Sequence, residues 1–265
     1  MADADTIVLV HGLWMNPVSW QGWIGRFTER GFTVLAPAWP GMEGDVEPVR
    51  RDTSGYAKLH VREIIDHYEA IIRGLPRPPI VMGHSFGGAF VQLLLDRGLG
   101  AAGVAVHSAP TRGVLRVPLS TIRSTLPIVR NPFNRNKAVE MTPQQFRYAF
   151  GNTLSEEKSL DVYLELSVPG VANILFAGAL ANVNPWSAFR VDYQRADRAP
   201  LLCIAGGTDH VVPASVNRAN VEKYRKSPAV VRYHEFPGRS HYTVGEDGWE
   251  QVADFALEWA VENQR

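Results

Sequence analysis

The feature that most constrains the fold is the stretch Gly83-His84-Ser85-Phe86-Gly87, in which a serine has a glycine two residues to either side. It follows the short apolar run Ile80-Val81-Met82 and leads into residues 86–97, which are apolar nearly all round. The first pattern is typical of a buried strand and the second of a buried helix. A turn this tight forces its central residue towards positive φ and leaves no room for side chains at the two glycines. The sequence therefore predicts a nucleophile elbow, which lifts the Ser85 hydroxyl clear of a sheet.

Strands and helices alternate on both sides of this turn, which predicts an α/β fold with a mostly parallel sheet covered by helices on both faces. A helical period runs through residues 53–73, and a last amphipathic helix carries Val252, Phe255, Ala256 and Trp259 on one face. Short apolar runs mark about six expected strands, at Ile7–Val10, Thr33–Ala36, Ile80–Met82, Gly103–Val106, Leu201–Ile204 and Val230–Tyr233.

The alternation breaks between roughly Thr111 and Asp197. No short β-branched run occurs there, and the segment is predicted to form several helices separated by proline-containing turns. We therefore expect a core domain made of residues 1–110 and 198–265. A helical cap, residues 111–197, is expected to be inserted into it.

A serine needs a base, and the base needs an acid that orients it. Around a nucleophile elbow, the acid and then the histidine follow the serine along the chain, each in a loop after a strand. Asp209 follows the expected strand Leu201–Ile204, and His241 follows Val230–Tyr233. We therefore expect Ser85, His241 and Asp209 to form a catalytic triad.

Other histidines and acids fit this pattern less well. His84 lies inside the elbow, where packing or hydrogen bonding is expected, and His107 ends a strand at the sheet edge that carries the site. Both are therefore predicted to lie at the substrate pocket. Six other residues compete less well because they lie on a helix, precede or fall within a strand, or adjoin Asp209. They are His60, His67, Asp192, Asp197, His210 and His234.

The first expected strand runs into His11-Gly12-Leu13-Trp14. Acyl transfer develops an oxyanion, which backbone N–H groups stabilise. One donor is the residue after the nucleophile, Phe86, at a helix N-terminus where the dipole favours negative charge. For the second we expect the N–H of Leu13, because Gly12 allows close backbone approach. Trp14 is then predicted to wall the acyl pocket.

Together these stretches resemble the α/β-hydrolase family. The residues that carry the resemblance are Val10-His11-Gly12-Leu13-Trp14, Gly83-His84-Ser85-Phe86-Gly87-Gly88, Gly206-Gly207-Thr208-Asp209 and Gly238-Arg239-Ser240-His241. The resemblance covers roughly the whole chain except the cap, and it implies an eight-stranded, mostly parallel sheet with a helical cap over the active site. The first strand begins at about Thr6, which leaves no room for the usual leading hairpin, so we expect six strands. The cap carries no motif that we can assign, which leaves the substrate open.

The expected function is that of a serine esterase, which cleaves a small-molecule carboxylic ester through an acyl-enzyme intermediate. This reaction needs no metal or organic cofactor. A cofactor-free haloperoxidase or perhydrolase, a lactonase or an acyltransferase would use the same triad and remains an alternative. Related epoxide hydrolases and haloalkane dehalogenases carry an aspartate at the elbow, so Ser85 argues against both. A non-catalytic small-molecule receptor on this scaffold is an alternative of another class.

The expected cap has an apolar and a basic part. Leu175 and Phe176 belong to an apolar run that would line an acyl pocket, or would only form the buried face of cap helices. The basic part is either a solvated face, which we favour because the chain has no net charge, or a surface for an anionic substrate or a membrane. It comprises Arg112, Arg116, Arg123, Arg130, Arg135, Lys137 and Arg147, with only Glu140 nearby.

Composition narrows the possible partners. Lys plus Arg and Asp plus Glu both number 27, so no global field favours nucleic acid. The single cysteine, Cys203, suits a reducing compartment. The N-terminus lacks the pattern of a signal peptide, and no segment approaches the ~18 apolar residues of a membrane span. We expect a cytoplasmic protein without a membrane span or a nucleic-acid partner; the oligomeric state is not predicted.

Overall fold

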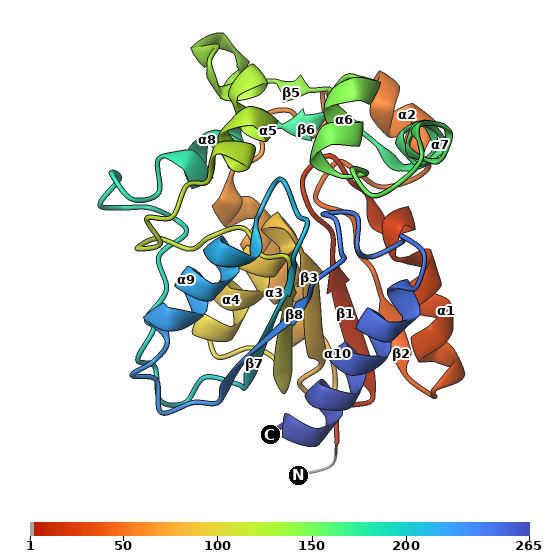
Figure 1. Ribbon diagram of the computed structural model, residues 1–265. Coiled ribbons are helices and arrows are strands. Elements are labelled where there is room, and N and C mark those ends of the chain that lie inside the picture. The colour runs from red at the N-terminus through yellow and green to blue at the C-terminus, as the bar shows by residue number, and fades with distance from the viewer. Residues whose placement is uncertain (1–2) are drawn as a thin grey trace.

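A six-stranded parallel sheet forms the centre of the protein in the computed structural model, which describes residues 3–265 (Figure 1). The strand order is β2-β1-β3-β4-β7-β8. The four inner strands are buried along their whole length, as their apolar runs predict. The predicted α/β fold with six strands is confirmed. The strands are β1 (Thr6–Val10), β2 (Thr33–Leu35), β3 (Ile80–His84), β4 (Ala102–Val106), β7 (Leu201–Gly206) and β8 (Val231–Phe236).

Helices cover both faces of this sheet (Figure 1). On one face, α1 and α10 contact each other; on the other, α3 packs on α4, and α9 lies over β7 and β8. All but the last residue of α4 are buried, which agrees with its apolar character on every side. The helices are α1 (Gln21–Glu29), α3 (Val61–Arg73), α4 (Phe86–Asp96), α9 (Ala214–Lys223) and α10 (Trp249–Asn263); the short η1 (Pro17–Trp20) precedes α1, and α2 (Val46–Arg51) precedes α3.

The helix expected from residue 53 begins later, at Val61. His60 caps it, and the Glu63 side chain accepts a hydrogen bond from the His60 backbone N–H at 2.8 Å. This capping box fixes the start of α3, and residues 53–60 form turns instead.

Residues 107–200, between β4 and β7, contain several helices above the carboxyl ends of the strands (Figure 1). Two strands of two residues each also pair there, antiparallel, which the proline-rich sequence did not predict. We call residues 111–197 the inserted segment. Its elements are α5 (Leu119–Val129), η2 (Pro132–Asn134), β5 (Ala138–Val139), α6 (Pro143–Ala149), α7 (Glu156–Leu166), β6 (Gly170–Val171) and α8 (Ala172–Ala179).

All six strands run in the same direction, so the loops that follow them meet at one edge of the sheet. The inserted segment lies over this edge (Figure 1). Among the described residues, no helix combines the length and the apolar character that crossing a membrane requires.

Candidate active site

Ser85 sits between β3 and α4 in a backbone conformation that side chains seldom adopt, with φ 58° and ψ −121°. The turn is held by neighbouring backbone. The Ser85 N–H donates to the Val106 carbonyl at 3.0 Å, and the Ser85 carbonyl accepts from the N–H of Ala109 at 2.9 Å. These bonds to the end of β4 and the loop after it hold the strained residue in place, as expected of an elbow.

The glycines of this turn are required by close backbone contacts. A Cβ on Gly87 would lie 2.7 Å from the His11 carbonyl oxygen and closer still to that of Val10. A Cβ on Gly12 would lie 2.8 Å from the Cβ of Ser85. The loop after β1 is therefore pressed directly against the elbow, which only residues without side chains permit.

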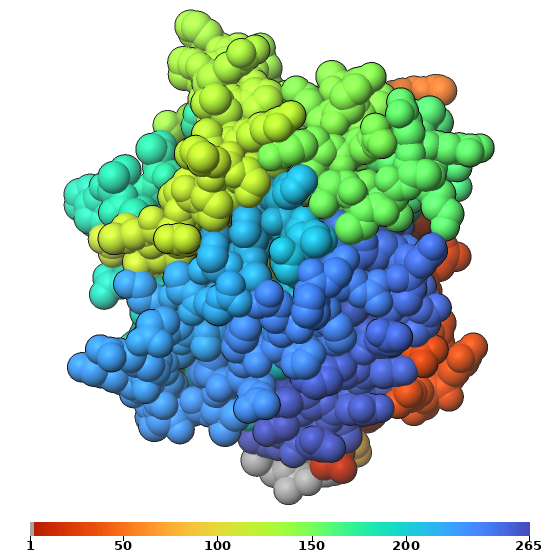
Figure 2. All heavy atoms as spheres, in the orientation of Figure 1, coloured from red at the N-terminus to blue at the C-terminus, as the bar shows by residue number. Residues whose placement is uncertain are grey.

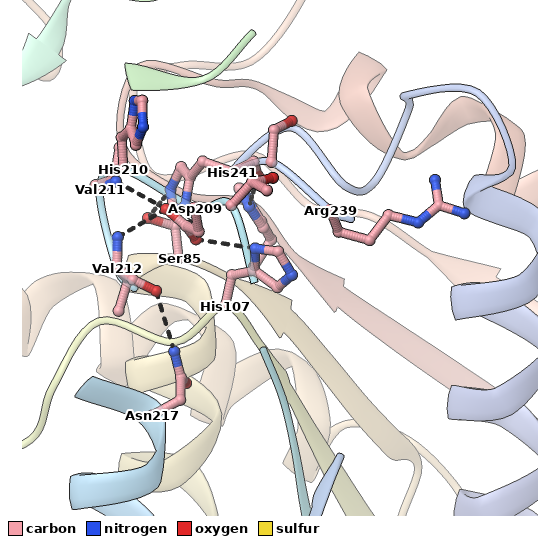
Figure 3. A network of polar contacts seen from close by, with 12 residues as sticks. Ser85, His107, Asp209, His210, Val211, Val212, Asn217, Arg239 and His241 are labelled. Atoms are coloured by element: carbon pink, nitrogen blue, oxygen red, sulfur yellow. Dashed lines mark hydrogen bonds and ion pairs between the residues drawn. The ribbon is translucent and has the colours of Figure 1, made fainter. Parts of the chain in front are cut away.

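The structure brings the three predicted triad residues together (Figure 3). The Ser85 Oγ lies 3.0 Å from the His241 Nε2, and the His241 Nδ1 lies 2.7 Å from the Asp209 Oδ2. A carboxylate only accepts, so the His241 Nδ1 carries the proton and its Nε2 is free to accept one from the serine. Asp209 and His241 come from the loops after β7 and β8, as the sequence predicts.

Asp209 is held by four donors in a buried position. Its Oδ1 accepts from the backbone N–H groups of Val211 and Val212, at 2.7 and 2.8 Å, and its Oδ2 accepts from His241 and His107. Burial by itself would raise the pKa of Asp209. The positive charge that His241 can carry and the hydrogen bonds from both histidines outweigh burial and hold that pKa below its usual value. The carboxylate is therefore charged at neutral pH.

His107, predicted to lie at the pocket, contacts Asp209 instead of an open cavity (Figure 3). It directly follows β4 and has φ 48°. Its Nδ1 donates to the Asp209 Oδ2 at 2.9 Å, and its Nε2 is buried with no hydrogen-bond partner among the described residues. The side chain is fully buried. His107 and His241 thus share one carboxylate oxygen.

His84 and His11 make structural hydrogen bonds. The His84 Nε2 donates to the His241 carbonyl at 2.7 Å, which ties the elbow to the histidine loop. Burial, and then the charges that His241 and His107 can carry, keep the His84 pKa well below its usual value. The His11 Nε2 accepts from the Trp39 N–H at 3.2 Å, and burial lowers the His11 pKa to about 4. Both rings are therefore neutral near pH 7.

The two predicted oxyanion donors lie on the backbone next to Ser85. Phe86 is the first residue of α4, and the first N–H groups of a helix have no acceptor within it. Leu13 follows Gly12, the residue that contacts the Ser85 Cβ, and its N–H donates to no atom of residues 3–265. Both N–H groups are therefore available to a ligand beside the serine.

Trp14 joins the loop after β1 to the inserted segment by hydrogen bonds. Its indole N–H donates to the Val139 carbonyl at 3.0 Å, and its own carbonyl accepts from the Val168 N–H at 3.0 Å. The ring also lies against Gly170, where a Cβ would come within 2.6 Å of its Nε1. Trp14, the predicted pocket wall, thus forms a contact between the core and the inserted segment. Its backbone has φ 64°.

Aromatic side chains close the site from above. Phe150 of the inserted segment lies edge-on to the His241 imidazole, with 4.8 Å between ring centroids. Gly178 of α8 lies against the Phe86 ring, and a Cβ there would come within 3.0 Å of it. Ser85 is only 3% exposed. Of the predicted pocket residues on α8, Leu175 is buried and Phe176 is half-buried.

Glu246 is a buried residue of the site region that sequence reasoning missed. Its carboxylate accepts hydrogen bonds from the backbone N–H and the hydroxyl of Ser240, at 3.0 and 2.6 Å, and from the Thr153 hydroxyl at 2.7 Å. It therefore fixes the residue before His241 and links that loop to the inserted segment. No motif marks Glu246, because its role depends on a loop that folds back on itself.

Among residues 3–265, one group of side chains has the composition of a metal site, namely His107, Asp209 and His241, whose ligand atoms lie within 4.8 Å of one another. Both imidazole Nδ1 atoms point at the same carboxylate oxygen and carry the protons of its hydrogen bonds. A cation would have to displace both protons. The arrangement fits a hydrogen-bond network better than a ligand set.

Comparison with known proteins agrees with this geometry. The family model described as "Alpha/beta hydrolase family" matches residues 7–255. A search of curated proteins found no match. Solved structures similar to this chain include the monoacylglycerol lipase of Paleococcus ferrophilus, with 20% identity, a TM-score of 0.66, and 99% of this chain and 97% of that chain covered.

Two further similar structures have a TM-score of 0.67 and 17% identity. One is an extracellular alpha/beta-hydrolase from a Paenibacillus species, with 98% of this chain and 99% of that chain covered. The other is a pyrethroid hydrolase from Sphingobium faniae JZ-2, with 97% of each chain covered. At these identities the likeness establishes the fold.

Proposed function

Because this chain belongs to the alpha/beta hydrolase family, we propose that it is a serine hydrolase that cleaves carboxylic esters. The observation that carries the proposal is the unbroken series of hydrogen bonds from the Ser85 Oγ through His241 to Asp209. The similar structures include proteins named as lipases and esterases, which supports the same class of reaction. The buried single cysteine, Cys203, fits the cytoplasm as the compartment.

In the proposed first step, the Ser85 Oγ attacks the ester carbonyl while its proton passes to the His241 Nε2. Asp209 accepts from the opposite nitrogen and stabilises the imidazolium. The carbonyl oxygen becomes an oxyanion between the N–H groups of Leu13 and Phe86. Collapse of this intermediate breaks the ester C–O bond, and the alcohol leaves with the proton from His241.

In the second step, His241 takes a proton from water, which attacks the acyl-Ser85 carbonyl. The carboxylic acid is released and the proton returns to Ser85. The proton exchanged between Ser85 and His241 moves between atoms that already lie at hydrogen-bond distance in the free protein. The charged Asp209 holds the imidazole in the tautomer that both steps need.

We further propose that the inserted segment acts as a lid. Ser85 is buried, and Phe150 and α8 cover the site. A substrate therefore reaches the serine only when this segment moves. Closure then excludes water and strengthens the electrostatic contacts around the oxyanion.

The test of the proposal is repeated turnover of p-nitrophenyl esters of graded acyl length. We expect many cycles per molecule and covalent labelling of Ser85 by a fluorophosphonate. Peroxide-dependent bromination that exceeds ester hydrolysis would instead favour a haloperoxidase or perhydrolase, and preference for cyclic esters a lactonase. Tight ligand binding with negligible turnover would favour a receptor.

We also propose that His107 positions the triad. It donates to the same Asp209 oxygen as His241, so it restricts rotation of the carboxylate and shares its negative charge. The side chain is fully buried and follows β4, the neighbour of β7, so its position is fixed by the sheet. Without this donor, Asp209 would be less well placed, and more of its charge would act on His241.

Replacing His107 with alanine should lower kcat about tenfold or more, the effect of losing one hydrogen bond to a charged group. It should also move the acid limb of the kcat/KM profile to higher pH, because the carboxylate then stabilises the imidazolium more strongly. His107→Asn places an amide N–H where the imidazole Nδ1 stands, and should restore both quantities. A lower rate with an unmoved pH profile in His107→Ala, and no rescue by asparagine, would mean that His107 only fills space.

A further inference from the structure

The outer surface of the inserted segment, residues 112–137 and 180–190, exposes large apolar side chains. All five of the large apolar side chains in residues 3–265 that are more than three quarters exposed lie on it, with Phe133 at 81% and Trp186 at 86%. The others are Leu115, Leu119 and Val183. Single exposed apolar residues are common, but their concentration on one surface marks an interaction site.

Helix α5 also exposes large apolar side chains, and their spacing places them on one face of the helix. Leu119, Ile122 and Leu126 follow the i, i+3, i+7 spacing of a helix face, and all three are exposed. The opposite side, with Ser124 and Ile128, is buried. An amphipathic helix normally buries its apolar stripe, so α5 presents to solvent a face that suits an apolar partner.

This outer surface carries only positive charge. Residues 112–139 and 180–190 contain no Asp or Glu. The exposed cations are Arg116, Arg123, Arg130, Arg135, Lys137 and Arg190, and within residues 3–265 none of them forms an ion pair. By contrast, Arg147, further along the segment, pairs with Glu156 at 3.3 Å. The nearest acids in sequence are Asp192, which accepts from the Gln194 N–H, and Glu140, which accepts from the Tyr163 hydroxyl.

The two stretches of the outer surface lie side by side. The Gly113 N–H donates to the Asn182 side chain at 2.6 Å, and the Asn182 amide donates to the Val114 carbonyl at 2.7 Å. In Figure 2 the yellow-green and teal parts of the chain project together from the upper left of the molecule. Positively charged and large apolar side chains therefore lie together at one end of the protein.

A groove of about 470 Å³ joins this surface to α3. Its cationic lining is Arg62 and Arg135, and its apolar lining includes Leu180, Val183 and Trp186; no acidic residue lines it. Ala177 of α8 also lines the groove, while the next residue, Gly178, lies against the Phe86 ring beside the nucleophile. The groove suits an anionic head group, and α8 connects it to the site.

We propose that the outer surface docks on an anionic lipid bilayer. Exposed Leu, Phe and Trp side chains enter the interfacial layer, and the arginines and Lys137 contact lipid phosphates. A second copy of the chain fits less well, because a symmetric contact would place this surface on itself and bring cations against cations. The proposal does not depend on the reaction at Ser85, because binding is measured without turnover.

The test is sedimentation of the full chain with vesicles of phosphatidylcholine containing 30% phosphatidylglycerol. We expect binding to these vesicles, little to pure phosphatidylcholine, and weakening in 0.5 M salt because exposed charges are screened. Arg130→Gln/Arg135→Gln should weaken binding about 25-fold, at about fivefold for each cation. Phe133→Ser/Trp186→Ser should weaken it by at least about tenfold through loss of apolar insertion.

Matched controls lie at the opposite edge of the sheet, where β8 begins. Lys226→Gln/Arg232→Gln removes two exposed cations and Val230→Ser removes an exposed apolar side chain, and both variants should bind as the parent does. An equal loss of vesicle binding in the control variants, or no binding of the parent protein to anionic vesicles, would overturn the proposal. So would binding to single-stranded DNA in place of vesicles, or a dimer in solution that Trp186→Ser dissociates.

Discussion

Replacing Ser85 with alanine should lower kcat for p-nitrophenyl ester hydrolysis by about 10⁴-fold or more, the scale of losing a triad nucleophile. The substitution removes the one oxygen that lies 3.0 Å from the His241 Nε2. Residual hydrolysis would then rely on water and the two oxyanion donors. Substrate should still bind, because the side chains around Ser85 and the backbone N–H groups of Leu13 and Phe86 are unchanged. Steady-state kinetics of purified protein with an unchanged unfolding midpoint is the measurement.

Ser159→Ala is the matched control for this variant. The Ser159 hydroxyl is also buried, in α7, but it has no hydrogen-bond partner within residues 3–265. Its removal should leave kcat unchanged. Turnover that survives in Ser85→Ala at more than a few per cent of the parent rate would show that another group carries the chemistry.

Replacing Gly87 with alanine should cost about 3 kcal/mol or more in unfolding free energy, as a clash that no rotamer relieves. The added methyl would meet the carbonyl oxygens of Val10 and His11, which belong to β1 and the loop after it. Relief would require α4 to move away from β1, and this would also displace the Phe86 N–H from the oxyanion position. The urea midpoint of unfolding and kcat for ester hydrolysis should therefore both fall in this variant.

The control is Gly25→Ala in α1. Gly25 is exposed, and a Cβ there would meet nothing within 4 Å. Alanine in a helix interior should raise the unfolding free energy by about 0.5 to 1 kcal/mol. A Gly87 variant as stable and as active as the parent would contradict the requirement for glycine at the elbow.

The sheet was predictable because its inner strands are buried on both faces. Ile7–Val10 and Leu201–Ile204 read as unbroken apolar runs, which few other structures produce. Helix α1 was not predicted, since Gly22 and Gly25 weaken its helical signal. Helix α9 is largely polar and shows almost no apolar period. The pair β5 and β6 has two residues per strand, too few for any period to appear.

The positions of Ser85, Asp209 and His241 were predictable because each follows a strand in a fixed order, and parallel strands bring such loops to one edge. The contact of His107 with Asp209 was not, because it depends on β4 lying next to β7, although about 95 residues separate them. The cover of Phe150 over His241 was not predictable either. It depends on the path of the inserted segment, which no pattern in the sequence specifies.

The two hydrogen bonds of Trp14 have a consequence for the timing of turnover. Trp14 adjoins Leu13 and is anchored to Val139 and Val168 of the inserted segment. In the proposed lid, an opening that moves Val139 or Val168 therefore pulls on the neighbour of Leu13, the predicted oxyanion donor. Such an opening would displace the oxyanion position while the substrate enters, so the rate of reclosing would set an upper limit on how often Ser85 can react.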